Sequence, residues 1–195
     1  MNIADYESYL KKKLTPKRFE HSLGVMRTME ELAPIYGLDK DQAVLAGLLH
    51  DAAKELPSDR WMALIRDNEP LLHDAEIYDY DHYLHGPVGA LVIQRELGIK
   101  ETAILEAIIA HGYYGSWEEF NRPLAWCLRF ADILEPGRDW SNNDWLKDIV
   151  HPMREAALGG RLMDAASLLP GRLIPWYESI GLSIHPNLRR AAAIR

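Results

Sequence analysis

Six polar side chains lie in apolar stretches where exposure to solvent does not explain them. They are imidazoles and carboxylates from five separate segments: His21, His50, Asp51, His85, His111 and Asp132. Asp132, for example, lies within "LRFADILE" and has apolar neighbours on both sides. A carboxylate in such a place needs a cation to compensate for its loss of water. The set therefore predicts either ion pairs within a core or a metal centre.

The ion-pair interpretation has partners for Asp132 close in the sequence, namely Arg129 and Arg138. The metal interpretation uses all six residues and is favoured by their ordered recurrence. Histidine and carboxylate ligands without cysteine suit Fe, Mn, Co, Ni or Zn better than a structural thiolate site. Six ligands are enough for two ions if Asp51 bridges them. Two metal ions about 3.5–4 Å apart form a phosphoester-cleaving centre that activates a water molecule.

Helices are expected to position these side chains. Apolar residues recur at helical spacing in residues 3–13, 16–36, 39–53, from 58 onward, 86–98, 100–111, 123–135, 148–159, 161–180 with a break at Pro170-Gly171, and after His185-Pro186. Residues 68–84 and 112–122 are expected to be irregular. No segment alternates with a period of two. The sequence therefore predicts an all-α fold, organised as one domain over residues 1–195.

Composition limits the partners and the compartment. A chain of 195 residues can bury one sizeable core, and its net charge of −7 argues against binding to macromolecular nucleic acid. No apolar run is long enough to span a bilayer, and the first residues lack the apolar centre of a signal peptide. The single cysteine, Cys127, fits a reducing cytosol. We expect a cytoplasmic protein that does not bind membranes. The oligomeric state stays open, a homodimer included.

Several longer motifs contain these residues. They are "RFEHSLGVMRTMEELA", "LAGLLHDAAKELP", "LHGPVGA", "FADILEPGR" and "IHPN". Together they resemble the HD-domain metal-dependent phosphohydrolase superfamily, and most closely its YqeK family. The resemblance implies an HD-domain helical bundle. It also implies a hydrolase that uses a metal-activated water, usually with iron, to cut diadenosine tetraphosphate symmetrically into two ADP.

The resemblance further implies a division of the ligands. One ion would be held by His21, His50, Asp51 and Asp132, and the other by Asp51, His85 and His111. Two departures from the family pattern lie beside the expected substrate site. Residues 112–122 replace a Thr-Thr-Gly-like turn, and Ile133 replaces a residue that is more often polar or aromatic.

Three cations near the expected centre are candidates for binding phosphate. Lys54 follows His50 by one helical turn, Arg18 precedes His21 by one turn, and Arg138 follows "EPG". Arginine can clamp a phosphate group with two hydrogen bonds. The alternatives are a solvent-facing Lys54, a surface Arg18, and a salt bridge between Arg138 and Glu135. With Asp51, Lys54 is also assigned to the catalytic set.

Aromatic residues follow His111 directly. Tyr113, Tyr114 and Trp117 could stack on a nucleobase, or could pack only against their own loop. No catalytic role is assigned to the remaining histidines, which are His73, His82, His151 and His185. The competing functions are another HD phosphohydrolase, such as a nucleotidase or a nucleotide phosphodiesterase, a non-catalytic metal- or nucleotide-binding HD protein, and a structural helical bundle.

Overall fold

The computed structural model describes residues 2–66, 79–113 and 123–193, and within these ranges all regular elements are helices. The first part of the chain forms α1 (Ile3–Lys13), α2 (Pro16–Ile35), α3 (Lys40–Leu49), α4 (Ser58–Arg66), a short 3₁₀ helix (Asp81–Tyr83), α5 (His85–Leu97) and α6 (Thr102–Tyr113). The second part forms α8 (Pro123–Leu134), α9 (Lys147–Leu158), α10 (Leu162–Leu168), α11 (Pro170–Ser179) and α12 (Pro186–Ala192). The predicted all-α fold is confirmed.

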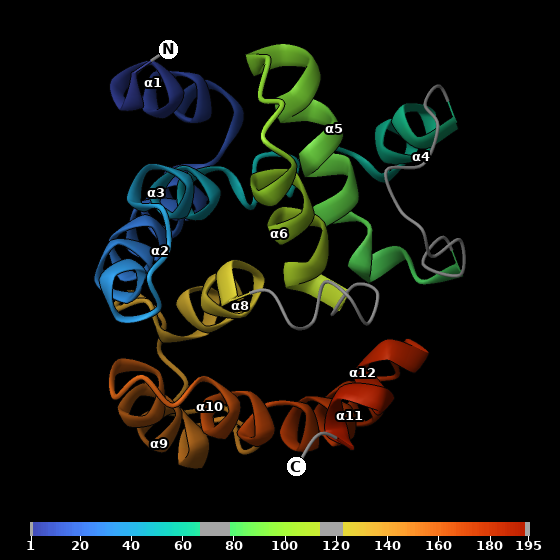
Figure 1. Ribbon diagram of the computed structural model, residues 1–195. Coiled ribbons are helices and arrows are strands. Elements are labelled where there is room, and N and C mark those ends of the chain that lie inside the picture. Colours follow the sequence, from blue (N-terminus) through green and yellow to red (C-terminus); the bar gives the residue numbers. More distant parts are fainter. Residues whose placement is uncertain (1, 67–78, 114–122, 194–195) are drawn as a thin grey trace.

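Helix α8 lies in the middle of the molecule (Figure 1). It packs against α2, α3 and α6 on one side and against α9 and α10 on the other. Trp126 and Phe130 of α8 are at most 1 % exposed, and their rings stack with centroids 5.6 Å apart. A central helix surrounded by others must be apolar over most of its surface. Asp132 on this helix is therefore an exception that needs an explanation.

Local sequence explains where the helices that carry the site begin. The Thr15 hydroxyl caps α2, and Pro16 occupies the first turn, where no backbone donor is required. The Asp39 carboxylate accepts a hydrogen bond from the backbone N–H of Gln42 and so caps α3. Gly98 ends α5 in the left-handed conformation at φ +71°, which glycine adopts without steric cost. These boundaries agree with the sequence prediction.

The end of α3 differs from the prediction. The helix was expected to continue to about Ala53, but it ends at Leu49. The chain then tightens into turns in which Ala52 N–H donates to the Leu49 carbonyl and Lys54 N–H donates to the Asp51 carbonyl. A tightened final turn is a common way to end a helix. Here it places His50 and Asp51 at the end of the helix rather than within it.

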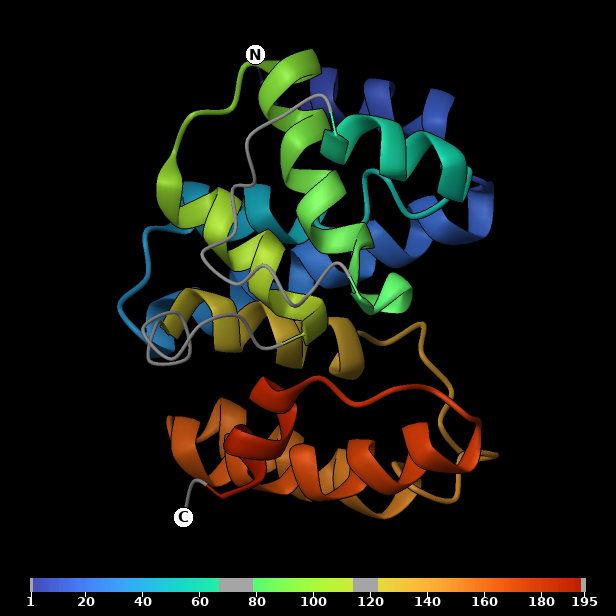
Figure 2. The ribbon, with the colours of Figure 1, turned by 90° about the vertical axis from the view of Figure 1, so that its right-hand side faces the viewer.

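The C-terminal helices α9–α12 form a separate layer below the other helices (Figures 1 and 2). The break expected at Pro170-Gly171 is confirmed, because α10 ends at Leu168 and α11 begins at Pro170. His185, from the "IHPN" motif, is fully buried and caps α12 by accepting from the backbone N–H of Asn187. Its ring also contacts the rings of Tyr80 and Tyr83, just before α5. The C-terminal layer therefore packs, through His185, against the segment that leads to His85.

No helix among the described residues is both long and apolar enough to cross a membrane. The one cysteine, Cys127, is buried in α8, as expected of a small core residue.

Candidate metal centre

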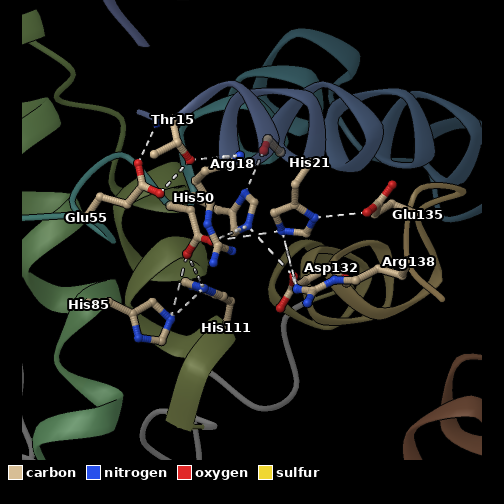
Figure 3. A network of polar contacts seen from close by, with 12 residues as sticks. Thr15, Arg18, His21, His50, Glu55, His85, His111, Asp132, Glu135 and Arg138 are labelled. Atoms are coloured by element: carbon tan, nitrogen blue, oxygen red, sulfur yellow. Dashed lines mark hydrogen bonds and ion pairs between the residues drawn. The ribbon is translucent and has the colours of Figure 1, made fainter. Parts of the chain in front are cut away.

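The six side chains singled out in the sequence meet where several helices end, and Figure 3 labels five of them, all except Asp51. They come from the middle of α2, the two residues that follow α3, the first residue of α5, the last turn of α6 and the last turn of α8: His21, His50, Asp51, His85, His111 and Asp132. All four histidines and Asp51 are at most 9 % exposed. The structure thus brings together residues from five segments, as the metal interpretation of the sequence requires.

Asp51 stands between two pairs of histidines. Its Oδ2 atom lies 3.5 Å from Nε2 of His50 and 3.9 Å from Nε2 of His21. Its Oδ1 atom lies 3.8 Å from Nε2 of His111 and 3.9 Å from Nε2 of His85. Ligand atoms of His21, His50 and Asp51 form one compact group, and those of Asp51, His85 and His111 form a second. One carboxylate that offers an oxygen to each group has the arrangement of a bridging ligand.

Three of the histidines are oriented by the backbone. In each, Nδ1 lies within hydrogen-bond distance of the carbonyl oxygen three residues earlier. The distances are 2.8 Å from His50 to Gly47, 3.1 Å from His85 to His82 and 2.5 Å from His111 to Ile108. A carbonyl can only accept, so Nδ1 carries the proton and donates. In the neutral ring, the lone pair of Nε2 then points into the cluster, as in histidines that bind metals.

His21 is oriented by a side chain instead. Its Nδ1 lies 3.0 Å from Oε1 of Glu135, a carboxylate that is 4 % exposed and also accepts from the backbone N–H of Gly137. Gly24 makes this approach possible, because a Cβ there would lie 2.3 Å from Oε2 of Glu135. The sequence interpretation missed this role of Glu135. A glycine inside a helix, three residues after His21, was the available clue.

The geometry within the cluster fits a cation. Nε2 of His85 and Nε2 of His111 lie 3.2 Å apart, although both rings use their Nδ1 protons elsewhere. Burial holds the pKa of His85 well below its ordinary value, so that ring is neutral. Nε2 of His50 is buried and has no hydrogen-bond partner among the described residues, and burial lowers the pKa of His50 to about 4. Inward-facing lone pairs with no proton to share fit a divalent metal ion.

The carboxylates of the cluster remain charged. Burial would raise the pKa of Asp51, but the surrounding imidazoles and Lys54 hold it well below its usual range. Arg18 donates from Nη1 to Oδ2 of Asp51 at 2.8 Å. For Asp132, burial is outweighed by the charge of Arg138 and the hydrogen bond with His21, which hold its pKa well below the usual range. Because Arg18 donates to Asp51, the alternative of a surface Arg18 without a role at the cluster is wrong.

The ion-pair interpretation of Asp132 is half right. Arg138 pairs with its Oδ1 atom at 2.5 Å, whereas the Arg129 guanidinium donates to the carbonyl of Ala110. The expected alternative for Arg138, a salt bridge with Glu135, is wrong because Glu135 faces His21. The ion pair does not remove Asp132 from the cluster, since the same Oδ1 lies 3.0 Å from Nε2 of His21.

The cluster is reached through two pockets. One has a volume of about 470 Å³ and is rich in cations, with Lys17, Arg18, Arg27 and Arg138 on its wall beside His21. The other has a volume of about 300 Å³ and is lined by cluster residues together with Lys54. Lys54 is half-buried, and burial lowers its pKa, although Asp51 opposes the shift. Lys54 thus faces the site, and the solvent-facing alternative is wrong.

The predicted aromatic contacts lie outside the described residues. Tyr113 is the last residue of α6, but the placement of its side chain is not described, and Tyr114 and Trp117 belong to the undescribed range 114–122. Instead, aromatic side chains from the C-terminal third line the smaller pocket: Trp140, Trp176 and Tyr177. His82, to which the sequence gave no role, lines it too. The sequence interpretation missed these residues.

The helical fold, together with histidines and aspartates that recur in a set order and meet at one point, defines the class of protein to which the chain belongs. The family model described as "HD domain" matches residues 18–137, which include all six residues of the cluster. The matched range ends before the C-terminal layer begins.

Comparisons that extend beyond this range narrow the class. The chain is 34 % identical over 182 residues to a protein named "Bis(5'-nucleosyl)-tetraphosphatase, symmetrical" from Halalkalibacterium halodurans, covering 91 % of this chain and 92 % of the relative. A protein of the same name from Bacillus subtilis is 33 % identical over 160 residues, covering 81 % and 82 %. The chain therefore belongs to the HD-domain superfamily and, within it, to the YqeK family, as the sequence motifs indicated.

A solved structure supports the fold. It is a "predicted HD superfamily hydrolase involved in NAD metabolism" from Clostridium acetobutylicum, with a TM-score of 0.85 and 30 % identity. The superposition covers 100 % of this chain and 96 % of that one. The expected HD-domain helical fold is therefore confirmed.

Proposed function

We propose that this protein is a metal-dependent hydrolase that cuts diadenosine tetraphosphate symmetrically into two ADP. The observation that carries the proposal is the position of Asp51, whose two carboxylate oxygens face two separate pairs of histidines. Two relatives aligned over more than four fifths of their length are named for this activity.

The proposed cofactor is a pair of divalent transition-metal ions, with iron as the first candidate and Mn, Co, Ni or Zn as the others. His21, His50, Asp51 and Asp132 would hold one ion, and Asp51, His85 and His111 the other. Such a pair polarises phosphoryl oxygens and supplies the nucleophilic water for an in-line displacement. The lowered pKa values of His50 and His85 and the depressed pKa of Asp51 mean that these ligands need not release protons when the ions bind.

Cationic side chains are proposed to hold the phosphate chain. Arg18 and Arg138 lie on the carboxylates of the cluster, so their remaining N–H groups can bind the phosphates of a substrate next to the ions. Lys54 lines the smaller pocket together with His85 and Asp132, and would neutralise charge on the leaving ADP. These three cations concentrate positive charge at the site, whereas the overall charge of −7 by itself repels a polyphosphate.

Other parts of the proposal rest on the sequence. Base contacts from Tyr113, Tyr114 and Trp117 stay a prediction. We place the enzyme in the cytoplasm, where a single buried cysteine stays reduced. One domain over residues 1–195, and a homodimer as one arrangement of the chain, are proposed on the same footing.

The test is hydrolysis of diadenosine tetraphosphate in heavy-oxygen water by metal-reconstituted protein. A symmetric cut yields only ADP, with the label on one ADP of each pair, because a single water attacks on one side of the central bridge. AMP and ATP as products would show an asymmetric cut and overturn the assignment. Release of inorganic phosphate from mononucleotides alone would favour a nucleotidase.

A further inference from the structure

The smaller pocket joins the cluster to the C-terminal layer. Three cluster residues line it, and so do three aromatic side chains that lie beyond residue 137, where the HD-domain match ends. The aromatic residues are Trp140, which precedes α9, and Trp176 and Tyr177 of α11. A molecule that fills this pocket contacts both sets. The C-terminal layer therefore contributes directly to the site.

The lining of the pocket suits a flat apolar ring with a charged end. Leu146, Leu173 and Leu182 add apolar surface to the aromatic wall, while Lys54 and Arg138 supply positive charge. A volume of about 300 Å³ is at the lower end of the range for small-molecule sites, roughly 300–1,000 Å³. Aromatic side chains stack on nucleobases of any sequence because every base has a π-face. The pocket therefore has the chemistry of a nucleotide site.

Trp140 is held in place from both sides. Its indole N–H donates to the carbonyl of Ile133 at 2.8 Å. The Arg138 guanidinium carbon lies 5.3 Å from the centre of its ring and, through Nη2, the same guanidinium reaches Asp132 of the cluster. Arg138 thus connects the cluster to the aromatic wall. A phosphate held by Arg138 lies next to a surface on which a base can stack.

Trp176 completes this wall, and its indole N–H has no hydrogen-bond partner among the described residues. Its ring centre lies 6.2 Å from that of Trp140, at an interplanar angle of 82°, and 5.5 Å from that of Tyr177. It remains half-buried. A half-buried tryptophan in a pocket that also contains charged groups can gain further contact area from a ligand.

We propose that this pocket binds the nucleobase of one end of the substrate, and that Trp176 determines the affinity for that base. The proposal rests on the proposed function for the choice of a nucleoside polyphosphate as ligand. It assigns the base contact to the C-terminal layer, whereas the sequence prediction assigned it to Tyr113, Tyr114 and Trp117. The phosphate chain then runs from the pocket to the cluster past Lys54 and Arg138.

The experiment compares three variants of the metal-loaded protein. Trp176→Leu removes the stacking surface, Trp176→Phe keeps an aromatic ring, and Trp145→Leu is the matched control, because Trp145 is another half-buried tryptophan that does not line the pocket. Binding of ADP and of inorganic tripolyphosphate is measured by calorimetry, and the KM for diadenosine tetraphosphate by product release. Metal content and thermal melts show whether each variant is folded and loaded.

We expect Trp176→Leu to weaken ADP binding and raise KM by about 10-fold or more, the effect of one lost base–aromatic stack. Tripolyphosphate binding should stay within about 2-fold, since it has no base. Trp176→Phe should retain most of the affinity, and Trp145→Leu should match the unchanged protein. Equal ADP affinity in folded, metal-loaded Trp176→Leu would overturn the proposal. So would a loss of ADP and tripolyphosphate binding to the same extent, which would show a structural role.

The same measurements separate this proposal from the proposed function. If the metal-loaded wild-type protein does not cleave diadenosine tetraphosphate, the proposed function is overturned. The ADP-binding measurement still decides whether the pocket binds a base. If the wild-type protein makes two ADP and Trp176→Leu has the same KM, only the proposal of the base site is overturned. Trp117→Ala with a 10-fold higher KM and a normal Trp176→Leu would instead assign the base contact to residues 113–117.

Discussion

His21 and His85 point the same ring atom toward Asp51, but they are held from behind in different ways. His85, like His50 and His111, donates its Nδ1 proton to a backbone carbonyl three residues earlier. His21 donates to Glu135, a residue 114 positions away in the sequence. Burial dominates the pKa of His85 and lowers it, whereas Asp132 and Glu135 overcome burial at His21 and raise its pKa.

This difference in hydrogen-bond partner divides the site into two parts. The orientation of the histidines is set by the backbone in one part and by a side chain in the other. A backbone carbonyl cannot be changed by substitution, so the orientation of His85 and His111 follows from the helices that carry them. A carboxylate behind a ligand raises its basicity as well as fixing its orientation. The strength of the His21 side therefore depends on side chains that a mutation can remove. The predictions below test this division, beginning with the residue that both sides share.

Removing the shared carboxylate should have the largest effect. Asp51→Ala takes away the oxygens that face all four histidines, so we expect loss of turnover and loss of bound metal on both sides. Asp51→Asn should behave similarly, because an amide is a poor bridging ligand. Metal analysis by mass spectrometry and turnover assays check this. An Asp51→Asn protein with full metal content would disprove the bridging role.

Asp132→Asn should affect only the His21 side. The substitution is nearly isosteric but removes the charge, and we expect metal affinity there to fall by more than the roughly 10–100-fold effect of losing a partner behind a ligand. The His85 side should keep its metal. If the pair with Arg138 is the main role of Asp132, the variant will instead have a lower melting temperature and normal metal content.

The buried neutral histidines should make the metal-stripped protein sensitive to acid. The folded-state pKa of His50 is about 4, against 6.5 when unperturbed, so between these values the unfolded chain binds a proton that the folded chain does not. Stability should therefore fall as the pH drops, by about 2–3 kcal/mol at pH 4.5 for His50, with His85 acting in the same direction. His21, with its raised pKa, acts in the opposite direction.

Urea unfolding in the presence of a chelator, at pH 7 and at pH 4.5, measures this loss. His50→Gln should reduce it, while the exposed His151 offers a matched control whose replacement by glutamine should leave it unchanged. The depressed pKa values of Asp51 and Asp132 add stability above about pH 4 that is lost only at lower pH, so they fall outside this interval. An equal loss in the His50→Gln protein would contradict the prediction.

Most residues of the metal centre could be predicted from the sequence because they are charged or polar side chains within apolar segments. Asp132 in an apolar helix, and His50-Asp51 at the end of another, are costly unless they have a common partner. The helices that carry them are also marked by local signals, such as Thr15-Pro16 and Gly98. Where the turn after Leu49 departs from the prediction, the helix ends early without a glycine or proline to mark it.

The contacts missed in the sequence depend on tertiary structure. Trp140 lies between α8 and α9, and Trp176 belongs to α11. The packing of the C-terminal layer against α8 brings the two side chains to the same pocket. Glu135 stands beside Pro136 near a helix end, where an acidic residue is commonly exposed. Apart from Gly24 in α2, nothing in the sequence indicates that it is buried against a histidine of that helix. Contacts between distant segments leave little trace in a single sequence.

Replacing Glu135 should produce the smallest of the four effects and is the most direct test of the division. In Glu135→Gln the side-chain oxygen can still accept from Nδ1 of His21, and only the charge is lost. We expect metal affinity on the His21 side to fall by about 10–100-fold, with the His85 side unaffected. A titration with Co²⁺, followed by its visible absorption, should then show one binding step shifted and the other in place. Glu155→Gln, at an exposed glutamate of α9, is the matched control.

Gly24→Ala should reproduce part of the effect while Glu135 itself is retained, because its added Cβ would push the Glu135 carboxylate away from His21. Two equally shifted steps would mean that Glu135 supports the whole cluster, and the distinction between its two sides would have to be abandoned.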